Sequence, residues 1–139
     1  MKKIIAFLVV FLTACSSETM KGYLTVNCIK EDHYNETINI NTISIKHKDN
    51  NIVNIKYSYK YEVSDKNILD SYKQSLISES NKYKDKNIKI SQEEKTNSFE
   101  IIYDIEIPDV TEEIRKEFDI DSLASNEIKK LEEKGYSCK

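Results

Sequence analysis

The chain has 139 residues, of which 32% are charged and 39% hydrophobic, and this length and composition fit one globular domain. Its two glycines and one proline exclude collagen-like repeats and linkers rich in Gly or Pro. The formal net charge of -3 leaves no basic excess, so we expect no nucleic-acid partner.

The N-terminus has the pattern of a signal peptide. Met1-Lys2-Lys3 is basic, residues 4–12 are all apolar, and Thr13-Ala14 precedes Cys15. The apolar run is too short for a membrane-spanning helix, which needs about 20 residues. Leu12-Thr13-Ala14-Cys15 resembles the lipobox of bacterial lipoproteins, in which the Cys receives a diacylglyceryl group and cleavage follows on its N-terminal side. An ordinary secretory signal with an incidental Cys is the alternative.

These features predict how the chain is divided and where it is located. We expect residues 1–14 to be a cleaved signal peptide, residues 15–21 to be the lipidated Cys15 and a tether, and residues 22–139 to form one domain. Two acyl chains hold a protein stably at a membrane, so the expected location is the extracytoplasmic face of the cell membrane. An acidic domain is not drawn to an anionic membrane surface, so it should stand off on its tether.

Three strands are predicted in the first half of the domain, at Tyr23–Ile29, at about 37–47 and at 53–63, with polar turns at 30–36 and 48–51. In the second strand the apolar residues change from even to odd positions, which predicts a bulge near Asn41-Thr42. The third strand alternates apolar and polar residues over eleven positions, and its odd-numbered face should lie against a helix.

The second half begins with a long helix, which Ser64 or Asp65 should cap and which should run to about Tyr83. Strands should follow around Ile88 and Ile90 and over 99–107. The last elements are a short helix over 110–118, a helix that Ser125 caps and Gly135 ends, and a terminal strand at 136–138. Because tight turns join the strands, we predict an α+β fold with a mainly antiparallel sheet of five or six strands.

Cys28 and Cys138 form an even pair if Cys15 carries the lipid. Domains outside the cytoplasm use such pairs as disulfides, and a bond here would clip the end of the chain to the first strand. Two reduced thiols, in an anaerobic host, are the alternative. A zinc site needs about four ligands, so these cysteines with His33 and His47 fall short and no metal site is predicted.

The two ends of the domain resemble a known family. The run Leu131-Glu132-Glu133-Lys134-Gly135-Tyr136-Ser137-Cys138-Lys139, with Thr25-Val26-Asn27-Cys28 soon after a lipobox, is similar to the YehR-like small bacterial lipoproteins, whose function is unknown. The resemblance implies Cys15 as the lipid site and Cys28 with Cys138 as a pair, and it implies no activity. The chain departs from the family pattern at Ile29-Lys30, where a small residue is expected.

The sequence predicts no catalytic residue and no cofactor. Two glycines cannot build a phosphate-binding loop. Asp119-Ile120-Asp121 begins like a calcium loop, but Lys130 occupies its twelfth position. His33 and His47 lie in or beside predicted turns without an evident nucleophile, so acid–base catalysis is not expected of them. Asp104 and Glu106 project from the polar face of a predicted strand and are expected to be solvated, since nothing else marks a sugar cleft.

The nine tyrosines are the most suggestive feature. Tyr57, Tyr59 and Tyr61 form a stripe along the third predicted strand, which could be an aromatic platform for a glycan or a protein partner. The alternative, which we favour, is that these rings belong to the core and pack against helix residues, with their hydroxyls at the rim: Leu69, Tyr72 and Leu76.

The leading hypothesis for function is a non-enzymatic lipoprotein domain that binds a protein partner in the cell envelope. A small solute- or metal-binding accessory lipoprotein is a second hypothesis, and it requires a concave pocket with convergent polar groups. A hydrolase is the third, and it requires a nucleophile and a base in contact.

Overall fold

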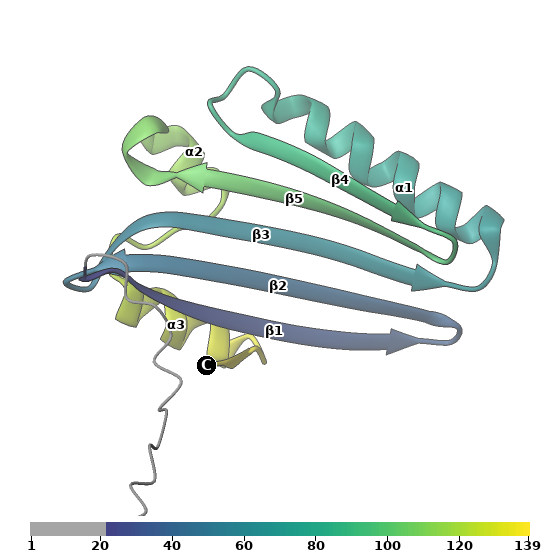
Figure 1. Ribbon diagram of the computed structural model, residues 1–139, viewed down its shortest axis with the longest axis horizontal. Helices are drawn as coiled ribbons and strands as arrows, with labels where there is room; N and C mark the ends of the chain where they lie inside the picture. The colour runs from purple at the N-terminus through teal and green to yellow at the C-terminus, as the bar shows by residue number, and fades with distance from the viewer. Residues whose placement is uncertain (1–21) are drawn as a thin grey trace, which may run out of the picture.

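The computed structural model describes residues 22–139, whose strands form one antiparallel sheet in the order β4-β5-β3-β2-β1-β6 (Figure 1). The strands are β1 (Leu24–Tyr34), β2 (Thr37–Lys48), β3 (Asn51–Val63), β4 (Lys89–Lys95), β5 (Ser98–Glu106) and β6 (Ser137–Cys138). The helices are α1 (Lys66–Ser80), α2 (Glu112–Glu117) and α3 (Ala124–Glu133), with 3-10 turns η2 (Asn81–Tyr83) and η3 (Ile107–Asp109). The predicted α+β class and the order of elements are confirmed.

The core lies on the face of the sheet that the helices cover. Alternate residues of β5 are buried, and they pair in register with the odd-numbered residues of β3. In Figure 1, α1 runs beside β4 and β5, whereas α3 lies near β1. The largest buried apolar side chains are Phe99, Ile45, Ile55, Ile101, Ile105 and Ile114.

The first hairpin is longer than the sequence predicts. β1 pairs with β2 without a shift from Leu24↔His47 to Tyr34↔Thr37, so the expected turn over 30–36 is wrong. The chain reverses only at Asn35 and Glu36, where Asn35 has a φ of 53°, a backbone conformation that Asn tolerates better than most residues. A strand near the sheet edge can carry polar side chains on both faces, as the second half of β1 does from Lys30 to His33.

The predicted bulge near Asn41-Thr42 is also wrong. The β2–β3 register shifts between Lys46 and His47 instead, and β2 runs regularly through residues 41 and 42. The change of apolar phase therefore places isoleucines on both faces of β2. Ile43 and Ile45 face the core, Ile38 and Ile40 lie on the opposite face, and Asn39 and Asn41 lie on the helix-covered face.

Asp65 caps α1, as one of the two predicted alternatives. Its side chain accepts hydrogen bonds from the backbone N–H groups of Asn67 and Ile68. The helix ends at Ser80, and η2 carries the chain on to Tyr83. Ile68, which the periodicity places on the apolar face, is instead 43% exposed, and Leu69 is the buried residue of this turn.

Asn50, in the β2–β3 turn, caps α3. Its backbone oxygen accepts from Ala124 N at 2.8 Å, and its Oδ1 accepts from Ser125 N at 2.9 Å. The prediction that Ser125 caps this helix is therefore wrong. At the other end, Gly135 has a φ of +89°, and Tyr136 N donates to Leu131 O at 3.0 Å, as in a Schellman motif.

The short strand β6 fastens the C-terminal segment to β1. Cys28 and Cys138 lie opposite each other in the pairing, and their Sγ atoms are bonded at 2.08 Å. On one side of this pair, Asn27 and Lys139 exchange backbone hydrogen bonds of 2.8 and 2.9 Å. Because β6 follows α3 directly, these contacts hold the helix against the β1 side of the sheet.

Candidate functional site

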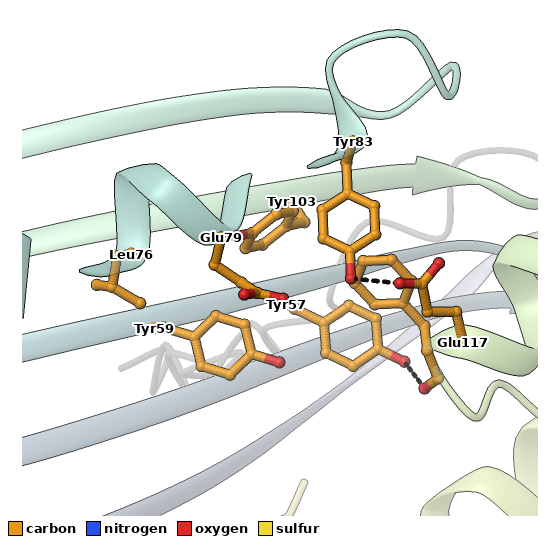
Figure 2. A pocket seen from close by; sticks show the side chains of 8 residues that line it. Tyr57, Tyr59, Leu76, Glu79, Tyr83, Tyr103 and Glu117 are labelled. Carbon is orange, nitrogen blue, oxygen red and sulfur yellow. Dashed lines mark hydrogen bonds between the residues drawn. The ribbon is translucent and has the colours of Figure 1, made fainter. Parts of the chain in front are cut away.

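A pocket of about 370 Å³ opens on the helix-covered face of the sheet, between the end of α1 and α2 (Figure 2). Its floor comes from the central strands, with Tyr57 and Tyr59 from β3 and Tyr103 from β5. Its rim comes from the helical segments and the chain that follows them: Leu76, Glu79, Tyr83, Glu117 and Phe118. Residues from five separate elements therefore converge on one concavity.

The aromatic rings of the pocket support one another around Tyr103. Its ring centroid lies 6.0 Å from that of Tyr59 and 5.8 Å from that of Tyr83, at interplanar angles of 76° and 89°. Phe118 completes the cluster at 5.9 Å and 60°. Edge-to-face pairs of this kind stabilise a fold by about 0.5–1.5 kcal/mol each beyond simple burial. The floor of the pocket is thus part of the core and is held in place by it.

The tyrosine hydroxyls of the pocket stay protonated at neutral pH. Burial raises the pKa of Tyr59 to about 12. Burial also raises the pKa of Tyr57 well above its usual range, and the nearby charge of Glu127 adds to this. For Tyr83, burial and the hydrogen bond to Glu117 both raise the pKa. These phenols are therefore hydrogen-bonding groups, and none is prepared to act as a base.

Two carboxylates belong to the rim. Glu117 Oε1 accepts a hydrogen bond of 2.9 Å from the Tyr83 hydroxyl, which Figure 2 shows. Glu79 Oε2 lies 2.6 Å from Lys82 Nζ, one turn further along the chain. The eight residues that line the pocket include no Lys, Arg or His. The pocket is consequently aromatic with a negative edge.

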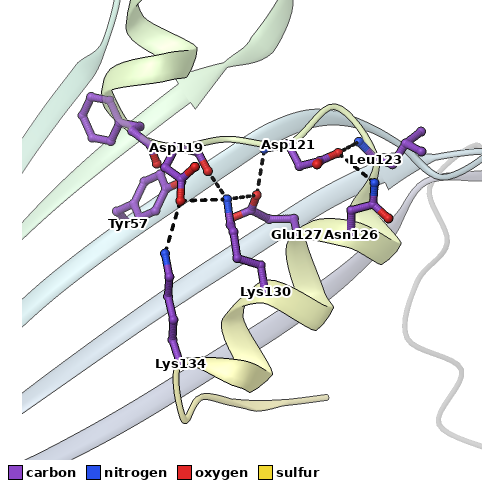
Figure 3. A network of polar contacts seen from close by, with 9 residues as sticks. Tyr57, Asp119, Asp121, Leu123, Asn126, Glu127, Lys130 and Lys134 are labelled. Atoms are coloured by element: carbon purple, nitrogen blue, oxygen red, sulfur yellow. Dashed lines mark hydrogen bonds and ion pairs between the residues drawn. The ribbon is translucent and has the colours of Figure 1, made fainter.

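A smaller hollow of about 170 Å³ adjoins the pocket and shares Tyr57, Tyr59 and Phe118 with it. Its other side carries the polar network of Figure 3, which is centred on Glu127, a side chain that is almost fully buried. Glu127 Oε2 accepts from Asp121 N at 2.8 Å and pairs with Lys130 Nζ at 2.8 Å.

Asp119 closes the same network. Its Oδ2 lies 3.2 Å from Lys134 Nζ and 3.3 Å from Lys130 Nζ, and the hydrogen bonds from these two lysines hold its pKa below the usual range. The side chains of Glu127, Asp119, Lys130 and Lys134 each have a partner of opposite charge. The network therefore fastens α3 to the loop before it, and we assign it a structural role.

The predicted tyrosine stripe divides along its length. Tyr57 is buried at 5% exposure and Tyr59 is half-buried, and both line the pocket. Tyr61 is also half-buried and stacks on Tyr72 of α1, with ring centroids 4.3 Å apart and an interplanar angle of 8°. The packing of Tyr61 on Tyr72 and the burial of Tyr57 agree with the core interpretation, and a role of the stripe as a binding platform stays a prediction.

Two asparagines of β2 extend the polar character of this face. Asn39 pairs in register with Tyr61, and Asn41 pairs with Tyr59. Their Oδ1 atoms are buried and have no hydrogen-bond partner among the residues that the structure describes. Such unmet acceptors are uncommon in folded proteins, where ordered water can supply the partner.

The pocket residues that the sequence does not reveal are Glu79, Tyr83, Glu117 and Phe118. They come from α1, η2, α2 and the residue after α2, and no spacing in the sequence links them. The tyrosine stripe was the available signal, and it identified Tyr57 and Tyr59 but not Tyr103 of the floor.

The other predicted polar residues lie outside the pocket, and among them Asp104 and Glu106 share a partner. His33 is exposed, with Nε2 2.5 Å from Glu31 Oε1, and His47 lies at the opposite end of the β1–β2 ladder. Asp104 and Glu106 lie on the other face of the sheet, where both accept hydrogen bonds from Asn54. Partial burial works against the charge of Asp104, but the Asn54 hydrogen bond and Lys56 lower its pKa.

Two further observations concern metals and membranes. Within residues 22–139, no cluster of three or more His, Cys, Asp or Glu side chains is arranged to hold a metal ion. None of the helices in this part of the chain has the length and hydropathy to cross a membrane. The predicted signal peptide, the lipid site at Cys15 and the tether lie outside the described residues.

Comparisons with known proteins inform the fold. No protein-family model matches the chain, and no curated protein matches it. A solved structure is similar, described as the NMR structure of the protein from Streptococcus pneumoniae TIGR4. It superposes with a TM-score of 0.59 at 13% identity, over 100% of this chain and 98% of the other. At this identity the likeness establishes a shared fold.

Proposed function

We propose that this protein is a lipid-anchored domain of the bacterial envelope, related to the YehR-like lipoproteins, and that it binds a ligand without catalysis. The observation that carries this proposal is the tyrosine-lined pocket of about 370 Å³. Its volume falls in the range of ligand sites, about 300–1,000 Å³, which combine apolar walls with a few polar groups. Its phenols are protonated and its carboxylates have no neighbouring nucleophile, so recognition is the chemistry that it suits.

Anchoring is proposed from the N-terminal pattern of basic residues, apolar run and Cys15. Mass spectrometry of the membrane fraction should find a mature chain that begins with a lipidated Cys15. A Cys15→Ala variant should leave that fraction, because the domain has no basic excess to hold it there. An exported protein that keeps Met1, or a Cys15→Ala variant that stays in the membrane, would contradict the anchoring.

The pocket itself is tested by filling it. Leu76→Trp adds a large ring at the rim, whereas Gln74→Trp adds the same ring at an exposed position of the same helix. In cells that lack the gene, we expect Gln74→Trp to restore the phenotype and Leu76→Trp to fail, with both proteins folded and exported. Rescue by Leu76→Trp would show that the function does not require the pocket.

The absence of catalysis is tested with single alanine changes at the exposed or half-exposed polar residues His33, His47, Asp104 and Asp121. All four variants should restore the phenotype. Failure of one of them, while it is folded and exported, would contradict the proposal that none of these polar residues takes part in the function.

A second candidate is docking of an envelope protein partner at the edge of β1. β6 pairs only with Cys28 and Ile29, and Asn27 exchanges hydrogen bonds with Lys139. By the alternation of an antiparallel ladder, the backbone groups of Glu31 and His33 point to the same edge, where an added strand could bind them. Glu31→Pro would block this edge, and proline is tolerated there. Failure of Glu31→Pro, with rescue by Leu76→Trp, would favour this candidate.

A further inference from the structure

The electrostatic character of the pocket narrows the class of its ligand. Two of its eight lining residues, Glu79 and Glu117, are acids, and none is a base. Glu117 makes no ion pair with any other residue of the described range 22–139. Glu79 pairs with Lys82, but both side chains are more than half exposed and such pairs are weak. A net negative charge therefore remains at the rim.

This negative charge reaches the inside of the pocket. Burial is the main reason that the pKa of Tyr83 is raised, and the charges of Glu117 and Glu79 add to it. Burial likewise raises the pKa of Tyr103, and here too the charge of Glu79 contributes. The carboxylates of Glu79 and Glu117 disfavour a negative charge on these phenols. The same field repels an anionic ligand and attracts a cation.

The walls of the pocket suit a cation that is only weakly hydrated. Five aromatic rings line it, and ring faces attract ammonium groups through their quadrupoles. The chain makes the same contact elsewhere with its own lysines: Lys46 Nζ lies 5.0 Å from the centroid of Tyr23, and Lys73 Nζ lies 5.8 Å from that of Phe99. No lysine within residues 22–139 lines the pocket, so its rings can receive an external cation.

We infer that the pocket binds an organic cation whose recognised end is an alkylammonium group, held between the rings of Tyr59, Tyr83 and Tyr103 and the carboxylates of Glu79 and Glu117. This inference rests on the proposed function, because it names the ligand class of the same site. The pocket is larger than one ammonium group, and the hollow beyond Tyr57 and Tyr59 leaves room for the rest of the ligand.

The test is a titration of the full-length protein with tetramethylammonium, and with tert-butanol as a neutral molecule of similar shape. Tyrosine ring resonances are followed by NMR at constant ionic strength. We expect saturable shifts in the rings of Tyr59 and Tyr83 with the cation, and binding of tert-butanol at least roughly tenfold weaker. Equal binding of the two probes, or no saturable shift with the cation, would overturn the inference.

Three Glu→Gln variants test whether the carboxylates of the pocket rim attract the cation. Glu117→Gln and Glu79→Gln keep the shape of the rim and should each weaken tetramethylammonium binding several-fold. Glu113→Gln removes an exposed carboxylate from the same short helix, outside the pocket, and should leave binding unchanged. An equal loss in all three variants would mean that overall charge, and not the pocket, attracts the cation, and the inference would fail.

The outcome is separable from that of the proposed function. If tetramethylammonium does not bind while Leu76→Trp still fails to restore the phenotype, the pocket is a binding site for a neutral ligand and only the cation is wrong. If Leu76→Trp restores the phenotype, the site itself is wrong.

Discussion

Asn50 joins two elements that are far apart in the sequence. It has a φ of 66° in the β2–β3 turn, its Oδ1 accepts from Ser125 N, and its Nδ2 donates to Ser125 Oγ at 3.0 Å. A side chain 75 positions upstream thereby meets the unpaired N–H groups at the start of α3. The sequence around α3 predicts a cap at Ser125 because a local pattern contains only neighbouring residues, whereas the observed cap is a tertiary contact from Asn50.

We predict that Asn50→Gly destabilises the protein by about 1 kcal/mol, because glycine keeps the positive φ and removes the cap. Asn50→Asp retains the acceptor and should be close to neutral. Asp49→Gly is the control, since Asp49 also has a positive φ, of 50°, and caps nothing. Urea unfolding followed by circular dichroism measures all three, and an Asp49→Gly loss as large as that of Asn50→Gly would contradict the assignment.

Asn41, in contrast to Asn50, has a side-chain oxygen without a hydrogen-bond partner within residues 22–139. Its buried Oδ1 has no partner in the described part of the chain, so replacing it should remove a desolvation penalty. Asn41→Val should stabilise the protein by about 1 kcal/mol, measured as a higher urea midpoint. Thr42→Val, one position along on the other face, should stay within about 0.5 kcal/mol of the parent. Destabilisation by Asn41→Val would show that the amide has a partner in solution.

At the scale of elements, the strands and α1 were predictable because each follows its own periodicity. β3 alternates apolar and polar residues from Val53 to Val63, and Asp65 precedes α1 directly. The errors arise where an element depends on another. The polar residues of β1 after Ile29 predict a turn, but they form a strand because β2 pairs with them. The phase change in β2 does not mark a bulge, because this strand carries isoleucines on both of its faces.

The β6 clip is an element whose contribution can be measured. The bonded cysteines are 110 residues apart, and for such a loop the chain-entropy model gives about 4–5 kcal/mol. In a Cys15→Ala background, we predict that a reductant lowers the free energy of unfolding by up to this amount. The Cys28→Ala/Cys138→Ala double variant should show a similar loss and no response to reductant. Alkylation of both thiols in protein isolated without reductant would disprove the bond.

At the scale of the whole molecule, the antiparallel sheet follows from tight turns between strands, but the pocket does not follow from any local pattern. Its rim exists because the end of α1, η2 and the end of α2 meet around Tyr103. That meeting depends on the packing of α2 and α3, whose positions are set by contacts such as those of Asn50 and Glu127. A single sequence carries no record of these distances.

The buried tyrosines predict how stability depends on pH. In the unfolded chain these phenols ionise near pH 10, whereas burial raises the pKa of Tyr59 to about 12 in the folded protein. The folded state therefore holds more protons above about pH 10, and stability falls as the pH rises through that range. Below about pH 10 this group makes no pH-dependent contribution.

The measurement is urea unfolding at several alkaline pH values, with phenolate absorbance recorded alongside. Each such tyrosine can contribute up to about 1.4 kcal/mol per pH unit, so Tyr59→Phe should flatten the decline by no more than this. An unchanged slope in Tyr59→Phe would mean that Tyr59 ionises freely in the folded protein.

The division of the pocket into floor and rim has a consequence for how the protein can diverge. Tyr57 and Tyr103 are almost completely buried, so their replacement would cost core stability. Glu79 and Glu117 are exposed, and substitutions at such positions usually change stability by less than about 0.5 kcal/mol. Homologous chains can therefore keep the tyrosine floor while the charge of the rim residues changes from negative to neutral or positive. Related proteins with this fold would then differ in what they select without differing in how they fold.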